Sequence, residues 1–218
     1  MTAKELLIHQ LNPRTLLVTV DDEPRLSTQS RLWVLIHSLR ESSTLSAHIE
    51  ELVPGMGNLM IRCQTADTLV ELQTLISALW ARTDTSAPPG RLHEIAVKYN
   101  DLHGPDLTEL AGLMAMSQEE FIHLHGSREY QVYCLGFQAG FAYMGDIDER
   151  LRFPRRDTPR TRVPSGSVAI AGQLTGIYPA ESPGGWHIIG HTDTCLFDIN
   201  RTEPTLFQPG DRVRFVPV

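Results

Sequence analysis

Six arginines crowd into thirteen consecutive positions of an otherwise acidic chain, whose net charge is −7. A guanidinium group is planar and donates paired hydrogen bonds, so it suits a carboxylate or a phosphate. Arg155 and Arg162, which flank a Val-Pro-Ser-Gly turn, are the preferred anion contacts, and Arg160 is the third choice. The alternative is a solvated loop neutralised by carboxylates between positions 146 and 157. The cluster comprises Arg150, Arg152, Arg155, Arg156, Arg160 and Arg162.

Histidine and aromatic residues stand in or beside glycine-rich turns of the same half of the chain. Histidine can exchange a proton near neutral pH, and tyrosine or tryptophan can wall a small amide ligand. Each alone is more often structural, so the hypothesis depends on their convergence. Because glycine lets the backbone approach a small anionic ligand closely, we expect one concave, substrate-binding surface. Its residues are Arg155, Arg162, Tyr178, Trp186 and His191, with His125, Gln138 and His187 nearby.

Other kinds of site lack a signature. The chain has no Gly-x-x-x-x-Gly-Lys-Ser/Thr loop, and its lysines are Lys4 and Lys98 alone, so it does not look like an ATPase by itself. No metal is expected, since no carboxylate or cysteine completes a ligand set with His123 and His125 or with His187 and His191. The catalytic residues stay unassigned, because no Ser-His-Asp set stands out. Cys63, Cys134 and Cys195 are expected to be reduced and mostly buried, with a catalytic thiol as the alternative.

The second half of the chain has the turn chemistry of a small β-barrel. Glycine and proline are dense between short apolar runs, which is typical of tight turns that join strands. Asp106 with Glu109, and Ser117 with Glu120, have the spacing of a capping box and predict two short helices. Strands are expected at 92–99, 167–170, 186–189 and 213–216, and helices at 106–114 and 117–125.

The first half alternates strand and helix signals. Two amphipathic stripes predict helices, opened by Ser27 and Asp67. The β-α-β-β-α order favours a small α/β sandwich, ferredoxin-like in outline. A polar, proline-containing linker at 83–90 separates the two halves. We therefore expect an α+β protein with domains at 1–88 and 89–218. The expected strands of the first half are 15–20, 47–53 and 58–63.

Composition argues against several classes of function. No basic run stands out, so nucleic acid is not an expected partner. No apolar stretch approaches the roughly 18–20 residues that span a bilayer, and the N-terminus lacks the pattern of a signal peptide. A cytoplasmic protein is expected.

Six short motifs follow one another in the second half of the chain. Together they resemble the family of allophanate hydrolase subunit 1 and the 5-oxoprolinase B subunit, which includes an inhibitor of a sporulation kinase. The resemblance covers about residues 99–215 and implies a cyclophilin-like β-barrel there. The motifs are GFQAGFAYMG at 136–145, VPSGSVAI at 163–170, TGIYP at 175–179, SPGGW at 182–186, LFD at 196–198 and PGDRVRF at 209–215.

The resemblance implies the B subunit of a bacterial ATP-dependent 5-oxoprolinase, which opens 5-oxo-L-proline to L-glutamate. ATP would be a co-substrate, bound by this chain or by a partner subunit. The implied partners are a sister subunit resembling allophanate hydrolase subunit 2 and a third subunit, without which the chain would be inactive. The alternative is a protein-interaction module that inhibits a sensor histidine kinase. A cyclophilin-like prolyl isomerase is a third interpretation, without an isomerase motif.

The chain departs from the family pattern at a few positions. Ala139 stands where relatives usually have proline, and Met144 where they have leucine. Leu174 stands where a glutamine is usual, which puts ligand recognition in question if that glutamine lines the pocket.

Overall fold

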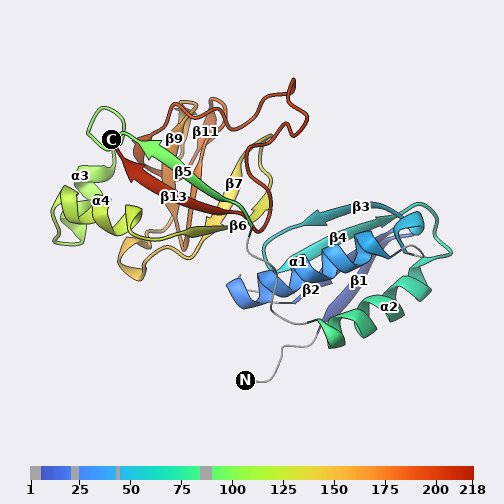
Figure 1. Ribbon diagram of the computed structural model, residues 1–218. Coiled ribbons are helices and arrows are strands. Elements are labelled where there is room, and N and C mark those ends of the chain that lie inside the picture. Colours follow the sequence, from blue (N-terminus) through green and yellow to red (C-terminus); the bar gives the residue numbers. More distant parts are fainter. Residues whose placement is uncertain (1–5, 21–24, 43–44, 84–89) are drawn as a thin grey trace. The chain divides into compact units, whose positions relative to one another are not determined.

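The protein is α+β and divides into two compact units, Met1–Pro88 and Pro89–Val218. The computed structural model describes residues 6–20, 25–42, 45–83 and 90–218 (Figure 1). Most of the linker expected at 83–90 lies outside the described residues.

The first unit is a four-stranded antiparallel sheet with two helices on one face (Figure 1). Its strands lie in the order β1-β2-β4-β3. Buried side chains alternate along β2 and β4 and meet the buried stripes of both helices in one apolar core. The elements are β1 (Leu7–Asn12), β2 (Thr15–Thr19), α1 (Leu26–Glu41), β3 (Ile49–Pro54), β4 (Asn58–Cys63) and α2 (Leu69–Arg82), with a 3-10 helix at Ser46–His48.

Two details of the first unit differ from the sequence prediction. The sequence does not predict β1, because its side chains are nearly all exposed and carry no alternating apolar signal. The N-caps of α1 and α2 are Arg25 and Thr68 rather than Ser27 and Asp67. Neither cap makes a side-chain hydrogen bond, so both helices depend on their buried faces.

The second unit is built on a seven-stranded, nearly closed sheet in the order β12-β9-β10-β7-β6-β13-β5. Lys98, just after β5, and His191, in β12, exchange backbone hydrogen bonds of 2.8 and 3.1 Å, which join the two edge strands. Strands β8 and β11 form a separate pair. The strands are β5 (Leu92–Val97), β6 (Tyr130–Leu135), β7 (Ala142–Gly145), β8 (Arg160–Val163), β9 (Ser167–Ala171), β10 (Leu174–Ile177), β11 (Ser182–Gly184), β12 (His187–His191) and β13 (Arg212–Pro217).

Two short helices, α3 (Leu107–Leu113) and α4 (Gln118–Gly126), lie between β5 and β6 in the chain (Figure 1). The expected capping box at Ser117 is confirmed, with Glu120 as its partner. The one expected at Asp106 is wrong, because the Asp106 side chain makes no cap bond and binds residues of the barrel instead.

Candidate functional site

A hollow of about 280 Å³ opens in the second unit, where the loop after β6 meets the ends of β7, β10 and β11. Its wall is mainly aromatic, and its one charged lining residue is an arginine. The lining residues are Phe137, Phe141, Tyr143, Arg155, Pro159, Tyr178, Pro183, Gly184, Gly185 and Trp186.

The aromatic wall is organised around Phe141. Its ring centroid lies 5.0 Å from that of Tyr143, 5.5 Å from that of Tyr178 and 5.6 Å from that of Trp186, all edge to face. Phe141, Tyr178 and Trp186 are buried. Such pairs are more favourable than their buried area alone, so the wall is a rigid surface formed before any ligand arrives.

Glycine allows this wall to close. A Cβ on Gly176 would lie 3.1 Å from the Phe141 ring, and a Cβ on Gly184 would overlap the Tyr178 hydroxyl. Larger residues at these two positions would push the rings apart. The glycines therefore leave the space that the aromatic side chains need to pack closely.

Arg155 supplies the positive charge of the hollow. Its side chain is exposed and forms no ion pair or hydrogen bond within the part of the chain that the structure describes. Burial raises the pKa of Tyr178 and of Tyr143, and the charge of Arg155 offsets only part of that rise. Both hydroxyls are therefore neutral at pH 7 and can donate hydrogen bonds. The arrangement suits a small, flat molecule that carries an anionic group.

Two neighbouring arginines, Arg156 and Arg160, bind a carboxylate of the protein. The buried carboxylate of Asp106 accepts a hydrogen bond of 2.9 Å from Arg156 and two bonds, of 2.9 and 2.7 Å, from Arg160. The backbone amide of Ile188 donates a further bond of 2.6 Å. Arg160, the third choice as an anion contact, therefore already has its anion. We call this set of four residues the Asp106 cluster.

Arg162 and His191 are not among the residues that line the aromatic hollow. The Arg162 side chain is 76% exposed and binds Glu181 at 2.6 Å. The imidazole Nε2 of His191 lies 3.1 Å from the carbonyl oxygen of Ser165. The structure thus brings together Arg155, Tyr178 and Trp186 but leaves the other two expected residues outside.

The remaining candidates have separate places. His125 is fully buried, with Nδ1 2.8 Å from the Tyr99 hydroxyl and Nε2 3.0 Å from that of Thr175. Gln138 donates a 3.0 Å bond to Ser182, beside the hollow. His187 lines a different hollow of about 400 Å³, which also contains Arg155.

Sequence reasoning missed three aromatic residues of the hollow, Phe137, Phe141 and Tyr143. The signal was present in the GFQAGFAYMG segment, where two Gly-Phe pairs and a tyrosine fall within ten residues. Aromatic residues repeated around turn glycines indicate rings that share one surface. The segment that carries the family resemblance therefore also builds the wall.

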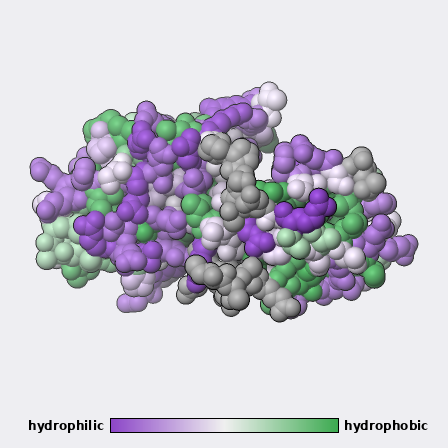
Figure 2. All heavy atoms as spheres, turned by 60° about the horizontal axis from the view of Figure 1, so that its bottom comes forward, coloured by the Kyte–Doolittle hydropathy of each residue, from purple (hydrophilic) through white to green (hydrophobic). Residues whose placement is uncertain are grey.

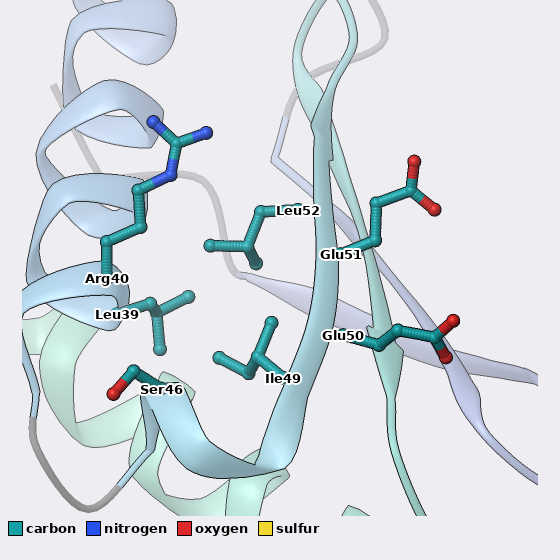
Figure 3. Close-up of a pocket in the computed structure, with 7 residues that line it drawn as sticks. All are labelled: Leu39, Arg40, Ser46, Ile49, Glu50, Glu51 and Leu52. Atoms are coloured by element: carbon teal, nitrogen blue, oxygen red, sulfur yellow. The ribbon is translucent and has the colours of Figure 1, made fainter.

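A hollow of about 360 Å³ in the first unit offers a contrast (Figure 3). Leu39 from α1 faces Ile49 and Leu52 from β3, whereas Glu50 and Glu51 point away from the helix. Both glutamates lie within ion-pair distance of Arg62. The polar side chains that line this hollow do not point towards one another. The hollow is therefore a gap at the edge of the layers rather than a ligand site.

Thiols and metals add nothing to the site. Cys63 and Cys134 are buried and Cys195 is exposed. Burial raises the pKa of Cys134 to about 12, so it is a poor nucleophile. Among the described residues, no group of three or more His, Cys, Asp or Glu side chains could hold a metal ion.

The described helices include none that is long and apolar enough to cross a membrane. The face in Figure 2 mixes hydrophilic and hydrophobic residues in small patches.

Two of the departures from the family pattern, Leu174 and Met144, lie away from the aromatic wall. Leu174 is buried in β10 opposite Gly145, and Met144 is in the barrel core. Neither lines the hollow. Leu174 therefore takes no part in the aromatic wall.

Comparison with known proteins supplies the family. Residues 6–207 match the model of the carboxyltransferase domain, subdomain C and D. The chain is 41% identical to the 5-oxoprolinase B subunit of Escherichia coli O157:H7 over 203 residues, which cover 92% of this chain and 91% of that protein. It is 44% identical to the 5-oxoprolinase B subunit of Haemophilus influenzae over 191 residues, or 86% of each chain.

A similar fold is known from the crystal structure of TTHA0988, with a TM-score of 0.80 and 33% identity. The match covers 94% of this chain but spans only 40% of that one. A full-length match to the two curated relatives and a family model over most of the chain agree. The chain belongs to the family of 5-oxoprolinase B subunits, within the carboxyltransferase subdomain C and D group.

Proposed function

We propose that this chain is the B subunit of an ATP-dependent 5-oxoprolinase, which opens 5-oxo-L-proline to L-glutamate. The observation that carries the proposal is the 41% identity to a 5-oxoprolinase B subunit over nearly the full length of both proteins. No specific feature of the chain favours kinase inhibition, so that alternative is not developed further.

The aromatic hollow is the proposed substrate site. The substrate is a small five-membered lactam with one carboxylate. In the proposed complex, Arg155 pairs with that carboxylate, and Tyr178 and Trp186 pack against the ring. Support comes from Arg155 having no partner among the described residues and lying beside a preformed wall. Arg162 and His191 are not proposed as contacts, since they lie outside the hollow.

The chemistry requires activation, because an unstrained lactam is a stable amide. Transfer of the γ-phosphoryl group of ATP to the lactam oxygen makes the carbon a better electrophile. Water then adds to that carbon, and the C–N bond breaks as the nitrogen takes a proton, which leaves an acyl phosphate. A second water hydrolyses the acyl phosphate to the carboxylate of glutamate and free phosphate. In the proposal, this chain binds and orients the lactam, and Arg155 contributes electrostatic stabilisation.

ATP is proposed to bind at a partner subunit or at a shared surface. The reason is that this chain has no phosphate-binding loop in its sequence. The proposed partners are a sister subunit resembling allophanate hydrolase subunit 2 and a third subunit. A cytoplasmic complex is the expected setting.

The finer fold assignments are also proposals. A ferredoxin-like outline is supported by the order β2-α1-β3-β4-α2, in which β4 separates β2 and β3. Strand β1 takes the edge position beside β2. A cyclophilin-like barrel is supported by the nearly closed seven-stranded sheet of the second unit.

Reconstitution tests the function. Purified chain and its candidate partner subunits are combined with 5-oxo-L-proline and ATP, and glutamate and phosphate are measured. Release of glutamate that requires both ATP and this chain is the expected result. Equal turnover by the partners alone would show the proposal to be wrong. A complex carrying Arg155→Ala is the matched control for a site on this chain.

A further inference from the structure

The backbone at Phe137 is strained. Phe137 has a φ of +66°, a value that bulky residues rarely adopt. The amide of Gln138 donates a 2.8 Å hydrogen bond to the carbonyl oxygen of Gly136. These two features define a γ-turn with a positive central φ, the rarer and more strained form of that turn.

The surrounding loop holds this strained turn in place. The amide of Gly136 donates to the carbonyl of Phe141 at 3.2 Å, and the amide of Phe141 donates to that of Gln138 at 3.0 Å. Gly140, with a φ of +84°, packs so closely that a Cβ there would lie 2.8 Å from the Cβ of Phe197. Strain of this kind persists when its neighbours impose it, and it concentrates at ligand sites.

The strained turn presents an exposed ring at the mouth of the aromatic hollow. Phe137 is 60% exposed, unlike the buried Phe141 and Tyr178. Its ring meets both of them edge to face, with centroids 5.4 and 6.2 Å apart. The fold therefore accepts both an unfavourable φ and an exposed apolar ring at one position. Packing among the described residues accounts for neither the positive φ nor the exposure of this ring.

We propose that Phe137 is a specificity-determining residue, whose ring covers the open side of a bound five-membered lactam and limits the ring size accepted. The inference rests on the proposed function, because it takes the hollow as the lactam site. On binding, the exposed face of Phe137 would be buried against the ligand, which adds apolar contact without ordering a flexible side chain.

The test compares two variants that remove the ring and relieve the strain, Phe137→Asn and Phe137→Gly. Asparagine tolerates a positive φ, and glycine has no penalty there. Binding of 5-oxo-L-proline and of its six-membered homologue, 6-oxopiperidine-2-carboxylate, is measured by calorimetry on the assembled complex. KM and kcat are measured beside it. Ala115→Gly is the matched control, since Ala115 also has a positive φ, of 52°, and does not line the hollow.

Both Phe137 variants should weaken 5-oxoproline binding by about tenfold and shift the five-to-six-membered affinity ratio by about tenfold towards the larger ring. The thermal midpoint of the chain should stay the same or rise, because strain is released. Ala115→Gly should leave binding unchanged. Unchanged affinities and an unchanged ratio in both Phe137 variants would overturn the inference.

Two further outcomes separate this inference from the proposed function. A wild-type complex that binds the lactams without turnover counts against the function, while the affinity ratio still decides the role of Phe137. Phe137 variants that lose subunit assembly but keep the ratio in the remaining complex would make Phe137 a subunit contact and overturn the inference.

Discussion

Residues 153–160 contribute to two regions that use arginine in opposite ways. Arg155 lines the aromatic hollow without an anion partner among the described residues, whereas Arg156, its neighbour in sequence, binds the buried Asp106. Arg160 joins the same carboxylate with two hydrogen bonds. Of two adjacent arginines, one therefore binds a buried carboxylate of the protein, and the other is the proposed substrate contact.

The two regions differ in whether their charged groups have hydrogen-bond partners within the protein. In the Asp106 cluster both carboxylate oxygens accept hydrogen bonds from arginine, and a backbone amide adds another. Such charge-assisted bonds are strong, and they match the charge of Asp106 within the protein. Arg155 instead forms no ion pair or hydrogen bond with any described residue, so its charge is available to an anionic ligand. An unsatisfied charge beside an apolar wall is thus the better indicator of a site than arginine density.

Replacing Asp106 with asparagine should have the largest effect on stability. It would remove the buried charge that holds Arg156 and Arg160, and losing one partner of such a pair costs about 3–5 kcal/mol. Urea unfolding of the isolated chain is the measurement. A loss below about 1 kcal/mol would mean that the cluster is not structural, and the contrast with the hollow would fail.

Replacing Arg155 with alanine should reduce activity without reducing stability. If Arg155 makes a charge-assisted bond worth roughly 1.5–3 kcal/mol, kcat/KM of the complex should fall about tenfold or more. Arg155→Lys should recover part of the loss, because it keeps the charge and loses the planar fork. Normal kcat/KM in Arg155→Ala would place the substrate elsewhere.

His125 is a second polar group that is buried and hydrogen-bonded within the fold, and it should make stability depend on pH. Burial lowers its pKa from 6.5 to about 3, so the unfolded chain takes up a proton below about pH 6.5 while the folded one does not. Stability is therefore full above pH 6.5 and falls as the pH drops towards 3. Between pH 7 and 5 the loss should be about 2 kcal/mol.

Urea unfolding at the two pH values measures this loss. His125→Gln should remove most of the pH dependence, whereas His123→Gln, an exposed neighbour on α4, should keep it. Equal pH dependence in both variants would contradict the assignment.

Replacing Arg162 with alanine should have the smallest effect. The sequence makes Arg162 a preferred anion contact, but its ion pair with Glu181 is exposed, and Arg162 does not line the hollow. Exposed pairs contribute about 0–1 kcal/mol, so both stability and kcat/KM should stay near wild type. A tenfold drop in kcat/KM would instead indicate that the substrate binds near Arg162. It would contradict the contrast drawn between Arg155 and the arginines that have partners.

Local signals predicted much of the fold. Strand β9 at Ser167–Ala171, the Ser117 capping box and the helical stripe of α1 all follow from neighbouring residues. The prediction failed at β1, where no apolar alternation marks the strand. It also failed for the capping box expected at Asp106. That side chain does not cap α3 and binds residues that are distant in the sequence.

The amino-acid sequence was sufficient for the family, the α+β class and the presence of an arginine-rich, aromatic second half, because motifs and turn residues act over short distances. Only the tertiary structure decided that Arg156 and Arg160 bind Asp106 while Arg155 has no ion pair with a described residue. Asp106 and Arg160 are 54 positions apart, and no local pattern could pair them. Phe141, Tyr178 and Trp186 likewise come from separate strands and turns, and only the closure of the sheet makes them one wall.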